Sequence, residues 1–165
     1  MRKLAALICS TALALGFSVG LGSSTPGWTM TQAAGTHQVS KHSHWMPAPP
    51  MFPPGAEIKV LQGDPSVAGK IFTVRLRMPK GYVLPAHFHP TDEAVTVIWG
   101  AFKVGIGDTY DPHTFLPTLY RGGFVVAPAG VHHFAKAAWR TVVQVNAIGP
   151  FSMTYVNPDD DPSRT

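Results

Sequence analysis

The sequence predicts an all-β protein, and three observations lead to that class. From Glu57 onward the chain consists of short apolar or alternating segments, the pattern of strands rather than of helices. Gly and Pro are abundant, at 16 residues each, as expected where many strands are joined by tight turns. No stretch has the periodicity of a helix of three clear turns, and the sequence contains no internal repeat.

The clearest predicted strand is 70–78, in which every second residue from Phe72 to Met78 is apolar. Segment 107–121 contains two Asp and two Pro residues and is expected to be a longer loop, with room for one helical turn. The other predicted strands are 57–61, 93–99, 102–106, 124–127, 131–135, 141–147 and 151–156.

The first 24 residues predict a secretory signal peptide. Arg2 and Lys3 precede an apolar stretch from Leu4 to Leu21, and small residues follow, with Ala34 as a second candidate cleavage position. The alternative is a retained membrane anchor, because the apolar stretch has about the length of a short spanning helix. We expect cleavage, a periplasmic or secreted mature protein, and no membrane association after processing.

Composition then excludes several classes of function. The 165 residues suffice for one domain with a core. Loss of Arg2 and Lys3 lowers the net charge from +4 (13 basic, 9 acidic) to +2 (11 basic, 9 acidic). Without a run of Lys or Arg, no nucleic-acid partner is expected. Loss of Cys9 leaves no cysteine for a disulfide or for thiolate chemistry.

Both ends of the predicted barrel carry extensions. Residues 25–56 form a Pro-rich arm, because five prolines between residues 46 and 54 favour extended geometry and forbid helix. Residues 157–165 form an acidic tail, for which a solvated end explains the carboxylates better than calcium does. Three histidines of the arm form either a weak copper or zinc site or part of a polar tail: His37, His42 and His44.

The candidate site begins with His87, His89 and Glu93. Residues two apart on a strand point to the same face, so His87 and His89 present two imidazoles side by side. A turn at 90–92 would aim Glu93 at the same place. Two imidazoles and one carboxylate form a ligand set for a first-row transition metal.

A second segment supplies another imidazole. An apolar strand at 124–127 and a Pro-Ala-Gly turn precede the adjacent pair His132 and His133. Adjacent strand residues face opposite sides of a sheet, so only one of the two can point into a shared cavity.

These segments resemble the two motifs of the cupins. The first cupin motif is Gly, five residues, His-x-His, three or four residues, Glu, six residues, Gly. The second is Gly, five residues, Pro-x-Gly, two residues, His, three residues, Asn. Nine positions match, namely Gly81, His87, His89, Glu93, Gly100, Gly122, Pro128, Gly130 and His133, whereas Ala137 stands in place of the closing Asn.

The resemblance covers about residues 57–156 and implies a cupin-type antiparallel β-barrel, that is, a jelly roll or double-stranded β-helix. It also implies one divalent metal, iron, manganese, zinc or nickel, held by His87, His89, Glu93 and His133, so it selects His133 over His132. Glu93 is the candidate catalytic residue, because its carboxylate can double as a base. Cupins commonly dimerise, and the arm is long enough to lie across a neighbour, so a homodimer is expected.

Two functions remain open at this point, because the cupins include oxygenases, decarboxylases, isomerases, sugar binders and storage proteins. The first is an exported metalloenzyme, dioxygenase-like, that acts on a small organic molecule. The second is a non-catalytic, metal-containing protein that binds a small ligand. Gln144 and Asn146 point either into the cavity or to solvent. The expected apolar wall consists of Phe72, Val74, Leu76, Val95, Val97 and Trp99.

Overall fold

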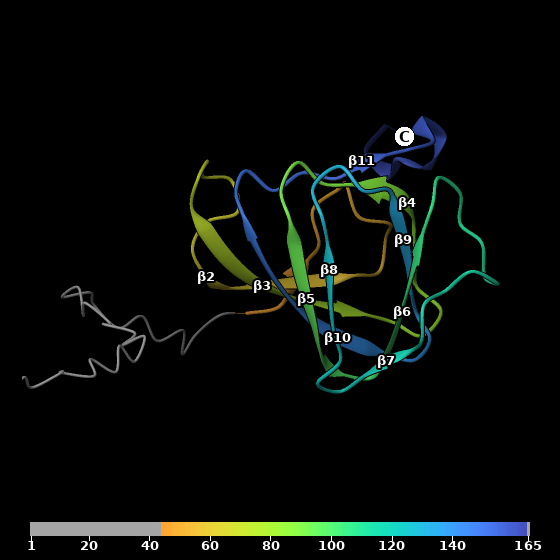
Figure 1. Ribbon diagram of the computed structural model, residues 1–165. Coiled ribbons are helices and arrows are strands. Elements are labelled where there is room, and N and C mark those ends of the chain that lie inside the picture. Colours follow the sequence, from red (N-terminus) through yellow and green to blue (C-terminus); the bar gives the residue numbers. More distant parts are fainter. Residues whose placement is uncertain (1–43, 165) are drawn as a thin grey trace, which may run out of the picture. The chain divides into compact units, whose positions relative to one another are not determined.

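A computed structural model describes residues 44–164, so the predicted signal peptide, His37 and His42 lie outside the described residues. The regular secondary structure of the described chain is almost entirely β-strand, which confirms the predicted class (Figure 1). Its helices are two short 3-10 turns in the acidic tail, Pro158–Asp160 and Pro162–Arg164. Over residues 44–164, no helix has the length and apolar character needed to cross a membrane.

The strands form two antiparallel sheets that face each other across the core (Figure 1). The six-stranded sheet has the order β1 (Met46–Pro47), β2 (Glu57–Gln62), β3 (Ile71–Met78), β10 (Thr141–Ile148), β5 (Glu93–Trp99) and β8 (Phe124–Ala127). The five-stranded sheet has the order β11 (Thr154–Tyr155), β4 (Val83–Phe88), β9 (His133–Ala137), β6 (Ala101–Ile106) and β7 (Leu119–Tyr120).

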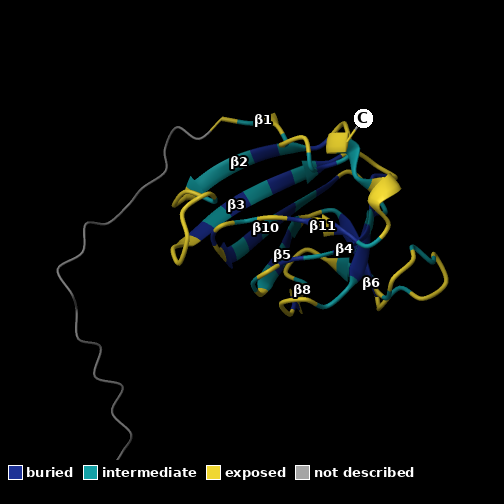
Figure 2. Ribbon diagram, turned by 90° about the horizontal axis from the view of Figure 1, so that it is seen from above, coloured by how far each residue is buried: buried dark blue, intermediate teal, exposed yellow. Residues whose placement is uncertain are grey.

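Alternation along β3 and β10 places the core between the sheets. Every second residue of both strands is buried, as the banded colouring of Figure 2 shows. β3 and β10 pair without a break from Ile71↔Ile148 to Met78↔Thr141. The alternation predicted for 70–78 is therefore confirmed, and the inward side chains of these strands form much of the hydrophobic core.

Four local predictions differ from the structure. β9 begins at His133 rather than at 131, and the final predicted strand shrinks to Thr154–Tyr155. The loop 107–118 contains no helical turn. Trp99 is 53% exposed and does not face the core. The ladder between β10 and β5 shifts register at this point, with Val142 opposite Trp99 and Val143 opposite Val97, which breaks the alternation.

The described part of the Pro-rich arm packs against its own barrel. β1 pairs with β2, with Met46 opposite Ile58, and the Ala48 N–H donates to the Ala56 carbonyl at 3.0 Å. Trp45 lies over the guanidinium of Arg77, 4.5 Å from it. β1 thus covers the outer edge of β2 within the same chain.

Gly100→Ala should destabilise the fold far more than Gly81→Ala, although both glycines have positive φ, 95° and 83°. A side chain at Gly100 would meet the Arg140 carbonyl and lie 2.7 Å from Thr141 Oγ1, whereas the space beside Gly81 is open. We expect losses of at least about 3 kcal/mol and of about 1 kcal/mol, respectively, in the free energy of unfolding. Chemical denaturation measures both, and equal losses would contradict the steric argument.

Candidate metal centre

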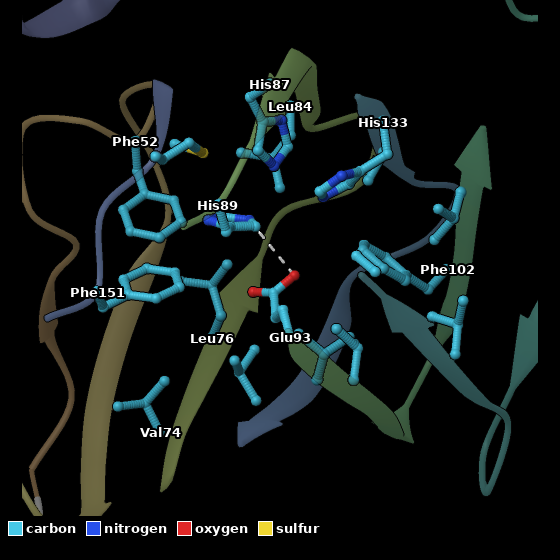
Figure 3. Close-up of a pocket in the computed structure, with 18 of the residues that line it drawn as sticks. Phe52, Val74, Leu76, Leu84, His87, His89, Glu93, Phe102, His133 and Phe151 are labelled. Carbon is cyan, nitrogen blue, oxygen red and sulfur yellow. Dashed lines mark ion pairs between the residues drawn. The ribbon is translucent and has the colours of Figure 1, made fainter. Parts of the chain in front are cut away.

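The candidate centre lies between the two sheets, where β4, β9 and β5 converge (Figure 3). His87 belongs to β4 and lies directly opposite His133 of β9 in the ladder. His89 follows β4, and Glu93 opens β5 in the other sheet. A register shift between Leu84 and His87 changes the parity of β4, so that Leu84 and His87, three residues apart, both line the cavity.

Three histidines form a compact group. His87, His89 and His133 each offer a ligand atom, and these atoms lie within 4.8 Å of one another. The ring centroids are 4.3 Å apart for His87 and His133, and 5.0 Å apart for His87 and His89. All three side chains are buried. The structure therefore brings together the three histidines that the sequence singles out.

Backbone carbonyls fix which nitrogen of each ring is protonated. His87 Nδ1 lies 2.6 Å from the Pro85 carbonyl, His89 Nδ1 lies 2.8 Å from that of Ser152, and His133 Nδ1 lies 2.9 Å from that of Val131. A carbonyl only accepts hydrogen bonds, so each Nδ1 carries the proton and donates it. Each Nε2 of a neutral ring then keeps a lone pair for a metal, in the manner of metal-binding histidines held by outer carbonyls.

The surroundings also keep these rings neutral. Burial lowers the pKa of His87 to about 3, with the neighbouring His133 and His89 as further causes. Burial likewise lowers the pKa of His89 and of His133. Neutral imidazole is the form that binds metal, so at neutral pH the group needs no deprotonation before it binds an ion.

Glu93 faces the same space but stands slightly apart. Its Oε2 lies 3.5 Å from His89 Nε2, the contact drawn as a dashed line in Figure 3. Glu93 is not part of the three-histidine group among the described residues. Burial raises the pKa of its carboxyl to about 7, while the nearby His133 acts in the opposite direction. With His89 neutral and Glu93 ionised, this contact joins two acceptors rather than an ion pair, and a cation between them would satisfy both.

These residues fit a divalent transition metal. His89 Nε2 is buried and has no hydrogen-bond partner within the described chain, an arrangement that costs free energy unless something binds the atom. Three imidazole nitrogens and a nearby carboxylate suit iron, manganese, nickel or zinc. The expected set is thus present around one cavity, and it consists of His87, His89, His133 and Glu93. The Glu93 carboxylate lies closest to His89 within this set.

Apolar side chains make up most of the rest of the cavity wall. Val74, Leu76 and Val95 line it as expected, whereas Phe72 and Val97 are buried in the core behind it. The cavity is small, with about 40 Å³ open to the centres of water-sized molecules. The lining also includes residues that were not predicted from the sequence, among them Phe52, Phe102, Phe151 and Met153.

The structure shows which way Gln144 and Asn146 point. Val143 and Val145 face the cavity, so Gln144 and Asn146 lie on the outer face of β10. There the Asn146 side chain accepts a hydrogen bond from Thr73 at 2.9 Å. The outer face of the sheet thus satisfies these polar groups, and they contribute nothing to the cavity.

The adjacent histidine pair points in two directions. His133 is 5% exposed and belongs to the group of three. The side chain of His132 is 37% exposed, with Nδ1 2.7 Å from a carboxylate oxygen of Asp108, and its ring stacks on Phe88. The two side chains therefore point in different directions, as expected, although β9 begins only at His133.

A family model described as the ChrR cupin-like domain matches residues 32–151. The chain belongs to this family. The match confirms the resemblance to cupins that the two motifs indicate, and it includes most of the Pro-rich arm and most of the barrel. No curated protein sequence matches the chain.

Several solved cupin structures are similar to this one. A candidate acetylacetone dioxygenase from Methylibium petroleiphilum PM1 has a TM-score of 0.58 and 20% identity, covering 81% of this chain and 90% of its own. An RmlC-like cupin from Ralstonia eutropha JMP134 has a TM-score of 0.58 and 18% identity, with coverages of 77% and 76%. Another from Shewanella frigidimarina NCIMB 400 has a TM-score of 0.53 and 16% identity, with coverages of 69% and 93%. At these identities the neighbours establish the cupin fold alone.

Proposed function

We propose that this cupin is a mononuclear metalloenzyme that acts on a small oxygen-bearing organic molecule, with dioxygen as co-substrate. One observation carries the proposal. All three Nδ1–H groups are donated to backbone carbonyls, which leaves three Nε2 lone pairs in one buried cavity. Holding three rings in this way is the arrangement expected of a metal centre rather than of histidines that only fill the core.

The chemistry divides between the metal and the chain. A bound iron or manganese ion would supply open coordination positions for an oxygen-bearing ligand or for dioxygen. His87, His89 and His133 hold their rings in fixed orientations, and the apolar wall excludes water from the reacting atoms. The Glu93 carboxylate faces the cavity, where its Oε2 can accept a proton from the substrate and return it.

β-Diketones are the first substrate class to test. A structural neighbour that aligns over 81% of this chain is a candidate acetylacetone dioxygenase. A β-diketone has two oxygens that can bind one metal together and an acidic C–H between them, which suits the proposed role of Glu93. The small cavity favours compact members of the class.

Oxygen consumption tests the proposal. The iron(II)-loaded protein is offered diketones, flavonols, thiols and catechols in an oxygen electrode, with Glu93→Ala and His89→Ala as controls. We expect uptake with at least one class, and its loss in both variants. No uptake with any class, together with zinc as the native metal, would contradict the enzyme assignment.

The second candidate is a non-catalytic, metal-containing protein that binds a small ligand. The limited volume and largely apolar wall of the cavity favour it, since they leave little room for a substrate to be rearranged. Tight zinc with no turnover would support this function, whereas redox-active iron with oxygen uptake would exclude it.

We further propose export, which the sequence supports, and a homodimer, an arrangement common among cupins. The apolar N-terminal stretch after Arg2 and Lys3 supports export to the periplasm or medium. N-terminal sequencing of native protein should find a start between residues 23 and 35, and retention of Cys9 would indicate a membrane anchor instead. Light scattering at micromolar concentration tests the dimer, and a monomer would refute it.

A further inference from the structure

One wall of the cavity comes from the Pro-rich arm rather than from a barrel strand. Phe52 is 8% exposed and lines the cavity together with Phe151. The two rings stack at 6.4 Å between centroids, and Phe151 in turn stacks on His89 at 5.1 Å. Figure 3 shows the three rings grouped together, with His89 nearest to Glu93. The arm thus reaches the candidate metal centre through one phenyl group.

Two tyrosines fix the arm on either side of Phe52. The Tyr155 hydroxyl donates to the Met51 carbonyl at 2.7 Å, and the Tyr82 hydroxyl donates to the Pro53 carbonyl at 2.5 Å. Burial raises the pKa of both tyrosines, so both hydroxyls keep the protons they donate. Residues 51–53, which we call the strap, are therefore attached to the barrel at both ends.

The local sequence makes the strap stiff. Two prolines precede it and Pro54 follows Pro53, and each proline ring fixes φ. The Phe52 N–H donates to the Pro49 carbonyl at 2.9 Å, which closes a turn. A chain restricted in this way loses little conformational entropy when it docks. The phenyl ring of Phe52 is thus held in one place rather than filling the cavity loosely.

We propose that Phe52 is a specificity-determining residue, which limits the size of the molecule that can bind beside His89. The inference rests on the proposed function, in that a small ligand enters this cavity. The present cavity is small, so a side chain on its wall decides how long a ligand can be. Removing the phenyl group would open a space next to Phe151 and extend the cavity toward the strap.

A series of carboxylates tests this role. The cobalt(II)-loaded protein is titrated with acetate, butyrate and hexanoate, and the visible absorption of cobalt reports a carboxylate oxygen at the metal. In the wild type we expect affinity to fall as the chain lengthens. In Phe52→Ala, hexanoate should bind at least about tenfold more tightly than in the wild type, at about fourfold for each methylene that enters the new space. Acetate should bind almost equally in both proteins.

Two further variants keep the test decisive. Met78→Ala removes a buried side chain that does not line the cavity, so it should lose stability yet keep the wild-type order of affinities. Phe52→Leu disturbs folding less, and like Phe52→Ala it should raise the affinity for hexanoate relative to that for acetate. Absence of cobalt binding in the wild type would overturn the metal centre and this inference together. Cobalt binding with an unchanged order in both Phe52 variants would overturn this inference alone.

Discussion

His133→Ala should abolish most metal binding, whereas His132→Ala should leave it nearly intact. His133 is buried with its Nδ1 tied to the Val131 carbonyl, so its Nε2 serves the metal centre. We expect a loss of affinity beyond about 100-fold, because outer partners of metal ligands alone are worth about 10- to 100-fold. His132 sits at the surface with Asp108, and its removal should change affinity less than about fivefold, the effect of about 1 kcal/mol.

Competition with a metal-binding dye measures both affinities under one set of conditions. The pair is well matched, since the two residues are adjacent and each change removes one imidazole. Equal losses in the two variants would contradict the assignment of His133 and would point to both side chains reaching the metal.

Glu93→Gln should gain stability over the wild type in the metal-free protein as the pH rises. The free energy of unfolding of the variant, minus that of the wild type, should be about 3 kcal/mol larger at pH 8 than at pH 4. Burial raises the pKa of Glu93 to about 7, from 4.5 for an exposed glutamate. The folded state therefore holds this proton more tightly than the unfolded state. The contribution of this proton to folding stability is fully present below pH 4.5, and it is lost as the pH rises through 7. Glutamine has no proton to lose, so the variant escapes this loss.

Urea denaturation of both proteins after chelation, at pH 4, 6 and 8, measures the effect. The histidines act with the opposite sign, because a lowered pKa removes stability as the pH falls below 6.5. Both proteins contain them, so their contribution largely cancels in the difference, apart from the effect of the Glu93 charge on the pKa of His133. With metal added, the order should reverse, since the variant lacks the carboxylate. A difference between the two proteins that is independent of pH would refute the argument.

The histidines could be identified from sequence because strand geometry is local. Spacing by two residues predicts that His87 and His89 share a face, and adjacency predicts that His132 and His133 do not. Two of the three Nδ1 partners are also local, since His87 and His133 each donate to the carbonyl two residues earlier. The third partner, the Ser152 carbonyl, is 63 residues from His89 and depends on how β11 returns to β4.

The features that escaped prediction depend on parity or on long-range packing. Alternation placed Gln144 and Asn146 on one face but could not say which face is solvated. Register shifts placed Trp99 outside and brought His87 to the same side as Leu84. Phe52 carries no periodic signal, because it lies among prolines and its burial depends on contacts with distant Phe151. Strand pairing and tertiary contacts decide these features, and the sequence does not display them.

Metal analysis of protein purified from its own compartment, combined with X-ray absorption spectroscopy at the metal edge, tests the central claim most directly. We expect one divalent ion per chain, with a ligand sphere that contains three imidazole nitrogens from His87, His89 and His133. A native protein that holds no metal, or an ion whose spectrum lacks imidazole scattering, would contradict it.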